Sequence, residues 1–191
     1  MKKLGIFIFN IAIIGLVSCN GTSKKAKDTT QEHQTMEMKS EVKKITFDME
    51  PKSGSTVKGT VEFSQMGDQV MMMAYLSGLT PGEHAIHLHE TADCSSDDGK
   101  STGGHWNPTH EPHGQWGSEK GYHKGDIGNF TVDADGNATI HFMTDQWCMD
   151  CDDPTRNIIG KAVIVHQGID DLVSQPSGAA GARVSCTGII Q

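Results

Sequence analysis

The chain has 191 residues, a formal net charge of −8 and 21% charged residues. The acidic balance and the lack of a basic stripe argue against nucleic-acid binding. Residues 42–191, which follow two distinctive N-terminal segments, are numerous enough to build one domain with a substantial core.

Residues 1–19 predict an export signal. Two lysines precede an apolar run at residues 4–17, which is too short to span a bilayer comfortably. The sequence Leu-Val-Ser-Cys at residues 16–19 resembles a bacterial lipobox, with cleavage on the N-terminal side of Cys19 and acylation of its sulfur. We therefore expect a lipoprotein of the bacterial cell envelope, anchored to a membrane and facing the periplasm. The alternative is an ordinary signal peptide that contains an incidental cysteine.

Residues 20–41 are polar and show no hydrophobic period, which predicts a flexible tether. As a coil, such a segment spans about 25 Å. The chain has five cysteines, an odd number for an exported protein. If Cys19 carries lipid, four cysteines remain, and these can form two disulfides in an oxidising compartment.

The domain at residues 42–191 shows short apolar runs separated by Gly- and Asp-rich turns, with no convincing helical period. This pattern predicts an all-β fold of eight short strands, arranged as an antiparallel sandwich or barrel. Two long segments without period, residues 91–126 and 168–182, predict functional loops. The predicted strands lie at residues 44–49, 57–63, 70–76, 84–90, 130–132, 138–142, 162–166 and 183–190.

The run Met71-Met72-Met73 lies within one of these predicted strands. It raises the possibility of a copper-handling segment. Alternation along a strand turns at least one of the three side chains inward, however, and methionine is a common filler of protein cores. Core packing is therefore the favoured interpretation of this run.

His87 and His89 belong to the apolar strand His84-Ala-Ile-His-Leu-His-Glu90. Side chains two residues apart in a strand point to the same face, so both imidazoles can reach one ion. Imidazole suits copper and zinc better than magnesium or calcium. The alternative for this pair alone is two solvated histidines on an exposed strand face.

Further metal-ligand candidates lie in the first long segment. His105, His113, His123 and Asp126 fall within 22 residues, and a His₃Asp set suits tetrahedral zinc in a structural role. His166 ends the apolar strand that begins at residue 162, so it can return beside the first histidine pair.

Taken together, these motifs resemble the copper–zinc superoxide dismutase family. The resemblance runs in the family's order across residues 43–191. It is carried by Gly82-Glu-His-Ala-Ile-His-Leu-His-Glu90, Gly104-His-Trp-Asn-Pro108, His113-Gly, His123-Lys-Gly-Asp-Ile-Gly-Asn129, Ile159-Gly160, Val165-His166, Asp170-Asp171 and Gly181-Ala-Arg-Val-Ser-Cys186.

The resemblance implies a Greek-key barrel, an antioxidant oxidoreductase activity, and superoxide as the substrate. It implies that copper cycles between Cu(II) and Cu(I), and that Asp170 ties a copper ligand to a zinc ligand. It does not decide whether the protein forms a homodimer or which partner delivers the copper. It also implies copper at His87, His89, His105 and His166, and zinc at His105, His113, His123 and Asp126.

Two more features follow from the resemblance. Cys94 and Cys186 are expected to form the intrachain disulfide. Arg183 is expected to attract and orient the anion at the copper site, and His105 to bridge both metals and supply a proton. The loop after residue 171 is short and carries no lysine or glutamate, so we expect Arg183, with Lys120 or Lys124, to guide the substrate.

The segment Asp145-Gln-Trp-Cys-Met-Asp-Cys-Asp-Asp-Pro154 is not part of the family pattern. A Cys-x-x-Cys sequence can be a redox motif, half a metal site or a short-loop disulfide. We expect Cys148 and Cys151 to form a second disulfide, with a second copper-handling site as the alternative. At the level of the whole protein, the alternatives to an enzyme are a metal-buffering envelope protein and an interaction module with a vestigial site.

Overall fold

The computed structural model describes residues 42–191, so the predicted signal peptide, Cys19 and the tether lie outside the described residues. The elements are β1 (Lys43–Pro51), β2 (Lys58–Met66), β3 (Gln69–Ser77), β4 (Gly82–His89), the 3₁₀ helix η1 (Lys100–Thr102), β5 (Gly128–Val132), β6 (Ala138–Thr144), β7 (Ala162–His166) and β8 (Arg183–Gly188). Within residues 42–191, no helix has the length and apolar character needed to cross a membrane.

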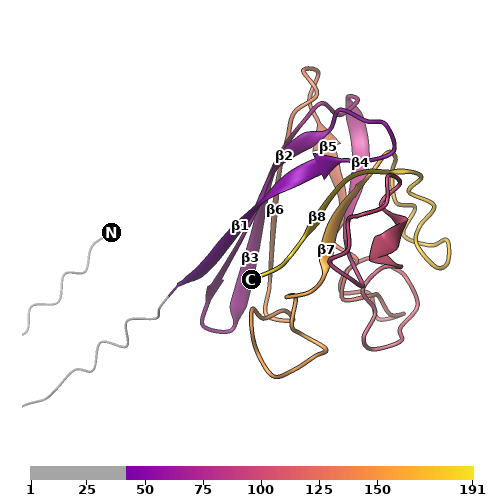
Figure 1. Ribbon diagram of the computed structural model, residues 1–191. Helices are drawn as coiled ribbons and strands as arrows, with labels where there is room; N and C mark the ends of the chain where they lie inside the picture. The colour runs from indigo at the N-terminus through magenta and orange to yellow at the C-terminus, as the bar shows by residue number, and fades with distance from the viewer. Residues whose placement is uncertain (1–41) are drawn as a thin grey trace, which may run out of the picture. The chain divides into compact units, whose positions relative to one another are not determined.

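The eight strands form one antiparallel sheet in the order β5-β4-β7-β8-β1-β2-β3-β6. The two end strands β5 and β6 contact each other, so the sheet curls into a nearly closed barrel (Figure 1). Three neighbouring pairs, β4–β7, β8–β1 and β3–β6, are not consecutive in the chain. These crossovers confirm the predicted all-β Greek-key barrel.

Strand alternation separates the core from the surface. On β3, Val70, Met72, Ala74 and Leu76 are buried, whereas the residues between them face outward. Phe63, Met72 and Trp147 are among the largest side chains in the core, and none of the three is exposed to solvent. Met72 thus has the core role that the sequence predicts for at least one residue of the methionine run.

The long loop between β4 and β5 is fastened to β4 by backbone hydrogen bonds. The Leu88 amide donates to the Gly125 carbonyl at 2.9 Å, and the Trp106 amide donates to the Leu88 carbonyl at 2.8 Å. A Cβ at residue 125 would overlap the Leu88 carbonyl, so this close approach requires glycine. The loop therefore lies against the strand that carries His87 and His89.

Two disulfides close this framework. Cys94, in the β4–β5 loop, is bonded to Cys186 on β8, and the two residues are 92 positions apart in the chain. Cys148 and Cys151 are bonded to each other within the segment between β6 and β7. The first bond ties the long loop to the sheet beside Arg183, whereas the second acts only locally.

Replacing both Cys94 and Cys186 by serine is expected to destabilise the fold by about 4.5 kcal/mol, the chain-entropy value for a loop of roughly 90 residues. Denaturant unfolding of the metal-loaded protein measures this loss. The matched control replaces Cys148 and Cys151, whose short loop is worth about 2 kcal/mol by the same relation. Equal losses in the two double variants would contradict the prediction.

Candidate metal centre

The β4 strand places its two histidines on the face away from the barrel core. Its inward neighbours Ile86 and Leu88 pack in the core, whereas His87 and His89 lie beneath the loops and are at most 1% exposed. In the adjacent strand β7, Ile164 pairs with His87. Because His166 lies two residues further along, it falls on the same face and reaches the pair.

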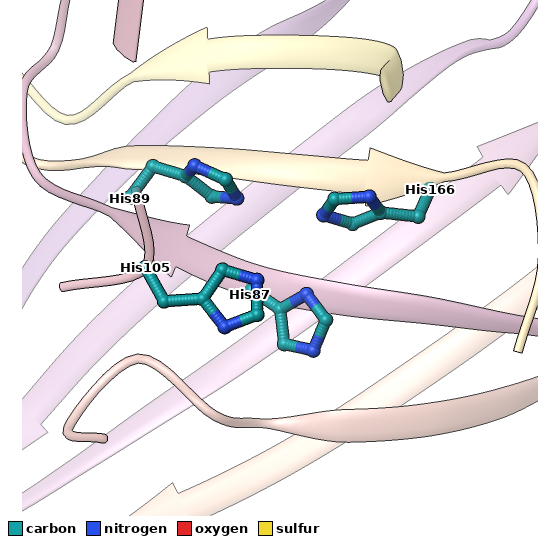
Figure 2. Close-up of side chains that lie close together, drawn as sticks. All are labelled: His87, His89, His105 and His166. Carbon is teal, nitrogen blue, oxygen red and sulfur yellow. The ribbon is translucent and has the colours of Figure 1, made fainter. Parts of the chain in front are cut away.

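Four imidazoles converge at this place. Ring nitrogens of His87, His89, His105 and His166 lie within 4.8 Å of one another, and the four rings face a common space in Figure 2. One nitrogen on each ring is buried and lacks a hydrogen-bond partner: Nδ1 of His87 and Nε2 of His89, His105 and His166. Buried polar atoms are costly when unpartnered, so this donor set fits a bound metal ion.

The remaining nitrogens of these rings have protein partners that fix the ring orientation. His89 Nδ1 lies 3.0 Å from the Gly103 carbonyl oxygen, and His166 Nδ1 lies 3.4 Å from that of Gly181. A carbonyl only accepts, so each Nδ1 carries the proton and each Nε2 has a free lone pair. This is the arrangement that metal-binding histidines need.

A second group adjoins the first and shares His105 with it. The ligand atoms of His105, His113, His123 and Asp126 also lie within 4.8 Å of one another. His113 Nδ1 is 3.0 Å and His123 Nδ1 is 3.3 Å from the Asp126 carboxylate, yet both nitrogens lack a hydrogen bond of acceptable geometry. Three imidazoles and one carboxylate fit a tetrahedral zinc ion.

Asp170 connects the two groups. Its Oδ2 accepts a hydrogen bond from His87 Nε2 at 2.8 Å, and its Oδ1 accepts one from His113 Nε2 at 2.9 Å. Asp170 is itself held by Asn129, whose side-chain oxygen accepts from the Asp170 amide at 2.8 Å. A Cβ at residue 178 would overlap the Asp170 carboxylate, so Gly178 leaves the space that this bridge occupies.

The electrostatics of the two groups follow from burial and these contacts. Burial lowers the pKa of His89 and His166 well below the usual value, and the pKa of His105 falls to about 4. Burial also lowers the pKa of His113, but the Asp126 carboxylate 3.0 Å from Nδ1 and the hydrogen bond to Asp170 outweigh it and raise that pKa to about 9. His89, His105 and His166 are therefore neutral at pH 7, the form that ligates metals.

The Asp126 and Asp170 carboxylates are ionised. Burial alone would raise the pKa of each, but the hydrogen bonds from the surrounding histidines lower it well below its usual range. The two carboxylates therefore supply negative charge next to the places where cations would bind.

Arg183 lies at the start of β8 and lines the cleft that opens above the first group. Its Nη1 donates hydrogen bonds to the Gly99 carbonyl at 2.8 Å and to the Thr102 hydroxyl at 3.0 Å. These contacts hold the guanidinium beside His89, His105 and His166, which line the same cleft. The Cys94–Cys186 disulfide ties together the two segments that make this arrangement.

The two lysines suggested by the sequence do not line this cleft. Lys124 faces a separate surface depression, where its Nζ is hydrogen-bonded to Gln146, and Lys120 is also absent from the lining of the metal cleft. The lysine that does line it is Lys100, with Asp98 3.1 Å away. Lys100 lies on η1, which packs beside Arg183. No local sequence pattern predicted this position.

A Greek-key β-barrel that carries two metal-binding groups joined through one histidine defines a class of dinuclear metalloprotein. A family model described as copper/zinc superoxide dismutase (SODC) matches residues 57–190. The chain belongs to this family of oxidoreductases, whose cofactors are copper and zinc.

Solved structures support the same relationship. A SOD-like protein from Bacillus subtilis is 28% identical, with a TM-score of 0.68. A single mutant of that protein is 29% identical with a TM-score of 0.67, and a double mutant is 30% identical with a TM-score of 0.69. Each comparison covers 76% of this chain and 97% of the other chain.

Substituting Asp170 by asparagine is expected to weaken metal retention roughly 10- to 100-fold, because His87 and His113 lose the carboxylate that orients them. Competition with a zinc or copper chelator measures the change. The control is Asp171→Asn, which alters an exposed carboxylate that accepts hydrogen bonds only from its own turn, at Val173 and Ser174. If both variants retain metal like the parent, Asp170 has no orienting role.

Proposed function

We propose that this protein disproportionates superoxide in the bacterial cell envelope: two superoxide anions and two protons give one oxygen and one hydrogen peroxide. The observation that supports this most strongly is the shared His105 ring. Its Nε2 belongs to the first group of ligand atoms, and its Nδ1 lies 2.9 Å from Asp126 in the second. A deprotonated imidazole has two lone pairs and can serve both metals.

The two groups differ in a way that suits two different metals. The first group, His87, His89, His105 and His166, offers only imidazole nitrogens and borders an open cleft, which suits a redox-active copper that must meet the substrate. The second group includes the Asp126 carboxylate and suits a structural zinc. When bound, copper supplies the electron exchange that no side chain provides, because it has accessible cupric and cuprous states.

The protein's own residues would bring the substrate in and deliver a proton. Arg183 stays cationic at every working pH, and its anchored guanidinium attracts an anion and orients it in the cleft. His105 lines the same cleft, and its Nε2 can hold a proton while Nδ1 stays with the second group. The hydrogen bonds of Asp170 keep His87 and His113 in place as this happens.

The envelope location is supported by sequence and by cysteine pairing. Residues 1–19 have the composition of a lipoprotein signal. The two disulfides use all four cysteines of residues 42–191, which fits an oxidising compartment. We infer that Cys19 carries the lipid, that residues 20–41 form the tether, and that residues 42–191 face the periplasm.

Metal buffering without efficient turnover is the second candidate function. Glu90 and Asp98 line the same cleft as Arg183, and their negative charge opposes the approach of an anion. Lys100 pairs with Asp98 at 3.1 Å and offsets part of this charge. The rate of superoxide turnover separates the two functions, because both require the same bound metals.

Replacing Arg183 by alanine is expected to lower the rate of superoxide disproportionation about tenfold, the low end of the 10- to 1000-fold by which the summed charge of a cleft raises association rates. Copper and zinc contents should not change. The control is Arg156→Ala, whose guanidinium bonds to the Asp145 carbonyl in another loop.

Replacing His87 by alanine should abolish copper binding and activity together. A metal-loaded parent that turns over no faster than buffer would support metal buffering instead.

Replacing Cys19 by serine is expected to release the protein from the membrane, because a serine hydroxyl cannot accept the thioether-linked lipid. Fractionation of cells into membrane and soluble envelope fractions, together with labelling by a radioactive fatty acid, measures this. The superoxide dismutase activity of the released protein should equal that of the parent. A C19S variant that still incorporates the labelled fatty acid would overturn the anchor assignment.

A further inference from the structure

Four methionines lie on the outer face of the sheet formed by β2, β3 and β6, away from the core. Alternation on β3 buries Met72 completely and turns Met71 and Met73 outward. Met143 on β6 is 53% exposed, and Met66 at the end of β2 is 62% exposed. The outer face of a sheet is usually polar, so this number of thioethers is unusual for a solvated surface. His141, which is also exposed, lies on the same face of β6.

The strand register brings these side chains together. Met71 is directly opposite Met143, and Met73 is directly opposite His141. Opposite residues of an antiparallel pair have Cβ atoms about 4.5–5.5 Å apart. Three thioether sulfurs and one imidazole therefore form a two-by-two block on the surface. Met66 adjoins it diagonally, because Met71 pairs with Ser64, two residues before Met66 on β2.

The chemistry of this block selects a soft monovalent cation. Thioethers are soft ligands that favour Cu(I), whereas Mg²⁺ and Ca²⁺ prefer oxygen. Methionine has three rotatable bonds, so several sulfurs can turn toward one ion without backbone movement. The neighbouring carboxylate of Glu62, opposite Met73 on β2, is already paired with Lys44 at 2.7 Å. Its charge is compensated, which leaves the soft ligands to determine the preference.

We propose that Met71, Met73, Met143 and His141 form a surface site for a cuprous ion, separate from the dinuclear centre. The two places lie on outward faces of opposite parts of the barrel. His87 and His89 are on the outer face of β4, whereas Leu88 on β4 and Met72 on β3 face inward into one core cluster, so the two outward faces point away from the same core. Figure 1 shows β3 and β6 on the side of the barrel away from the loop between β4 and β5. This site stands on its own residues and does not depend on the proposed enzymatic function.

The test uses the full chain loaded with zinc and cuprous copper and labelled with ¹³C at the methionine methyl groups. Ag(I), a redox-inert probe of Cu(I) sites, is added to one equivalent. The methyl resonances of Met71, Met73 and Met143 should shift together and reach saturation near one equivalent, along with the His141 ring signals. The resonances of the buried Met49, Met72 and Met149 should not move.

Paired variants make the test decisive. Met71→Leu combined with Met143→Leu should abolish the one-equivalent step, whereas Met72→Leu on the inner face of the same strand should retain it. Leucine conserves most of the volume of methionine, so these variants should fold, and superoxide turnover should match the parent. The proposal is overturned if Ag(I) shifts only Met36 and Met38, if no resonance saturates near one equivalent, or if the double variant binds like the parent.

Discussion

The structure depends on one energetic constraint: six buried imidazole nitrogens have no hydrogen-bond partner in the protein. Each such atom costs about 1–3 kcal/mol when it is removed from water without compensation. A fold that gathers six of these nitrogens in one place is stabilised by the metal ions to which they donate their lone pairs. Metal binding is therefore part of the folding free energy of this protein as well as the source of its chemistry.

Both the barrel strands and the loops position these imidazole rings. The sheet supplies His87, His89 and His166 at fixed register positions, and the loop between β4 and β5 supplies the remaining ligands. Three devices join the two parts: the close backbone contact at Gly125, the Cys94–Cys186 disulfide and the Asp170 bridge. The disulfide also ties to β8 the loop whose Gly99 and Thr102 contact Arg183, so loop stability and the proposed guidance of the substrate by Arg183 are physically linked.

The sequence was sufficient for the fold and for the ligand candidates, because strand alternation and His-x-His spacing are local signals. His166 could be placed beside His87 only through β-strand pairing, and the family resemblance supplied the sharing of His105. Neither Lys120 nor Lys124 lines the cleft, and Lys124 is hydrogen-bonded to Gln146, so their suggested part in guiding the substrate stays a prediction. Lys100, Thr102 and Gly178 were missed because their roles arise from contacts between loops distant in sequence.

The most direct test of the central claim is element-specific X-ray absorption of the protein loaded with one copper and one zinc per chain. The account predicts copper surrounded by imidazole nitrogens, and zinc surrounded by three nitrogens and one carboxylate oxygen. It also predicts that His105→Ala changes the spectra of both metals, since one ring serves both groups. A copper spectrum dominated by sulfur, or a H105A variant in which only one metal responds, would contradict a shared histidine.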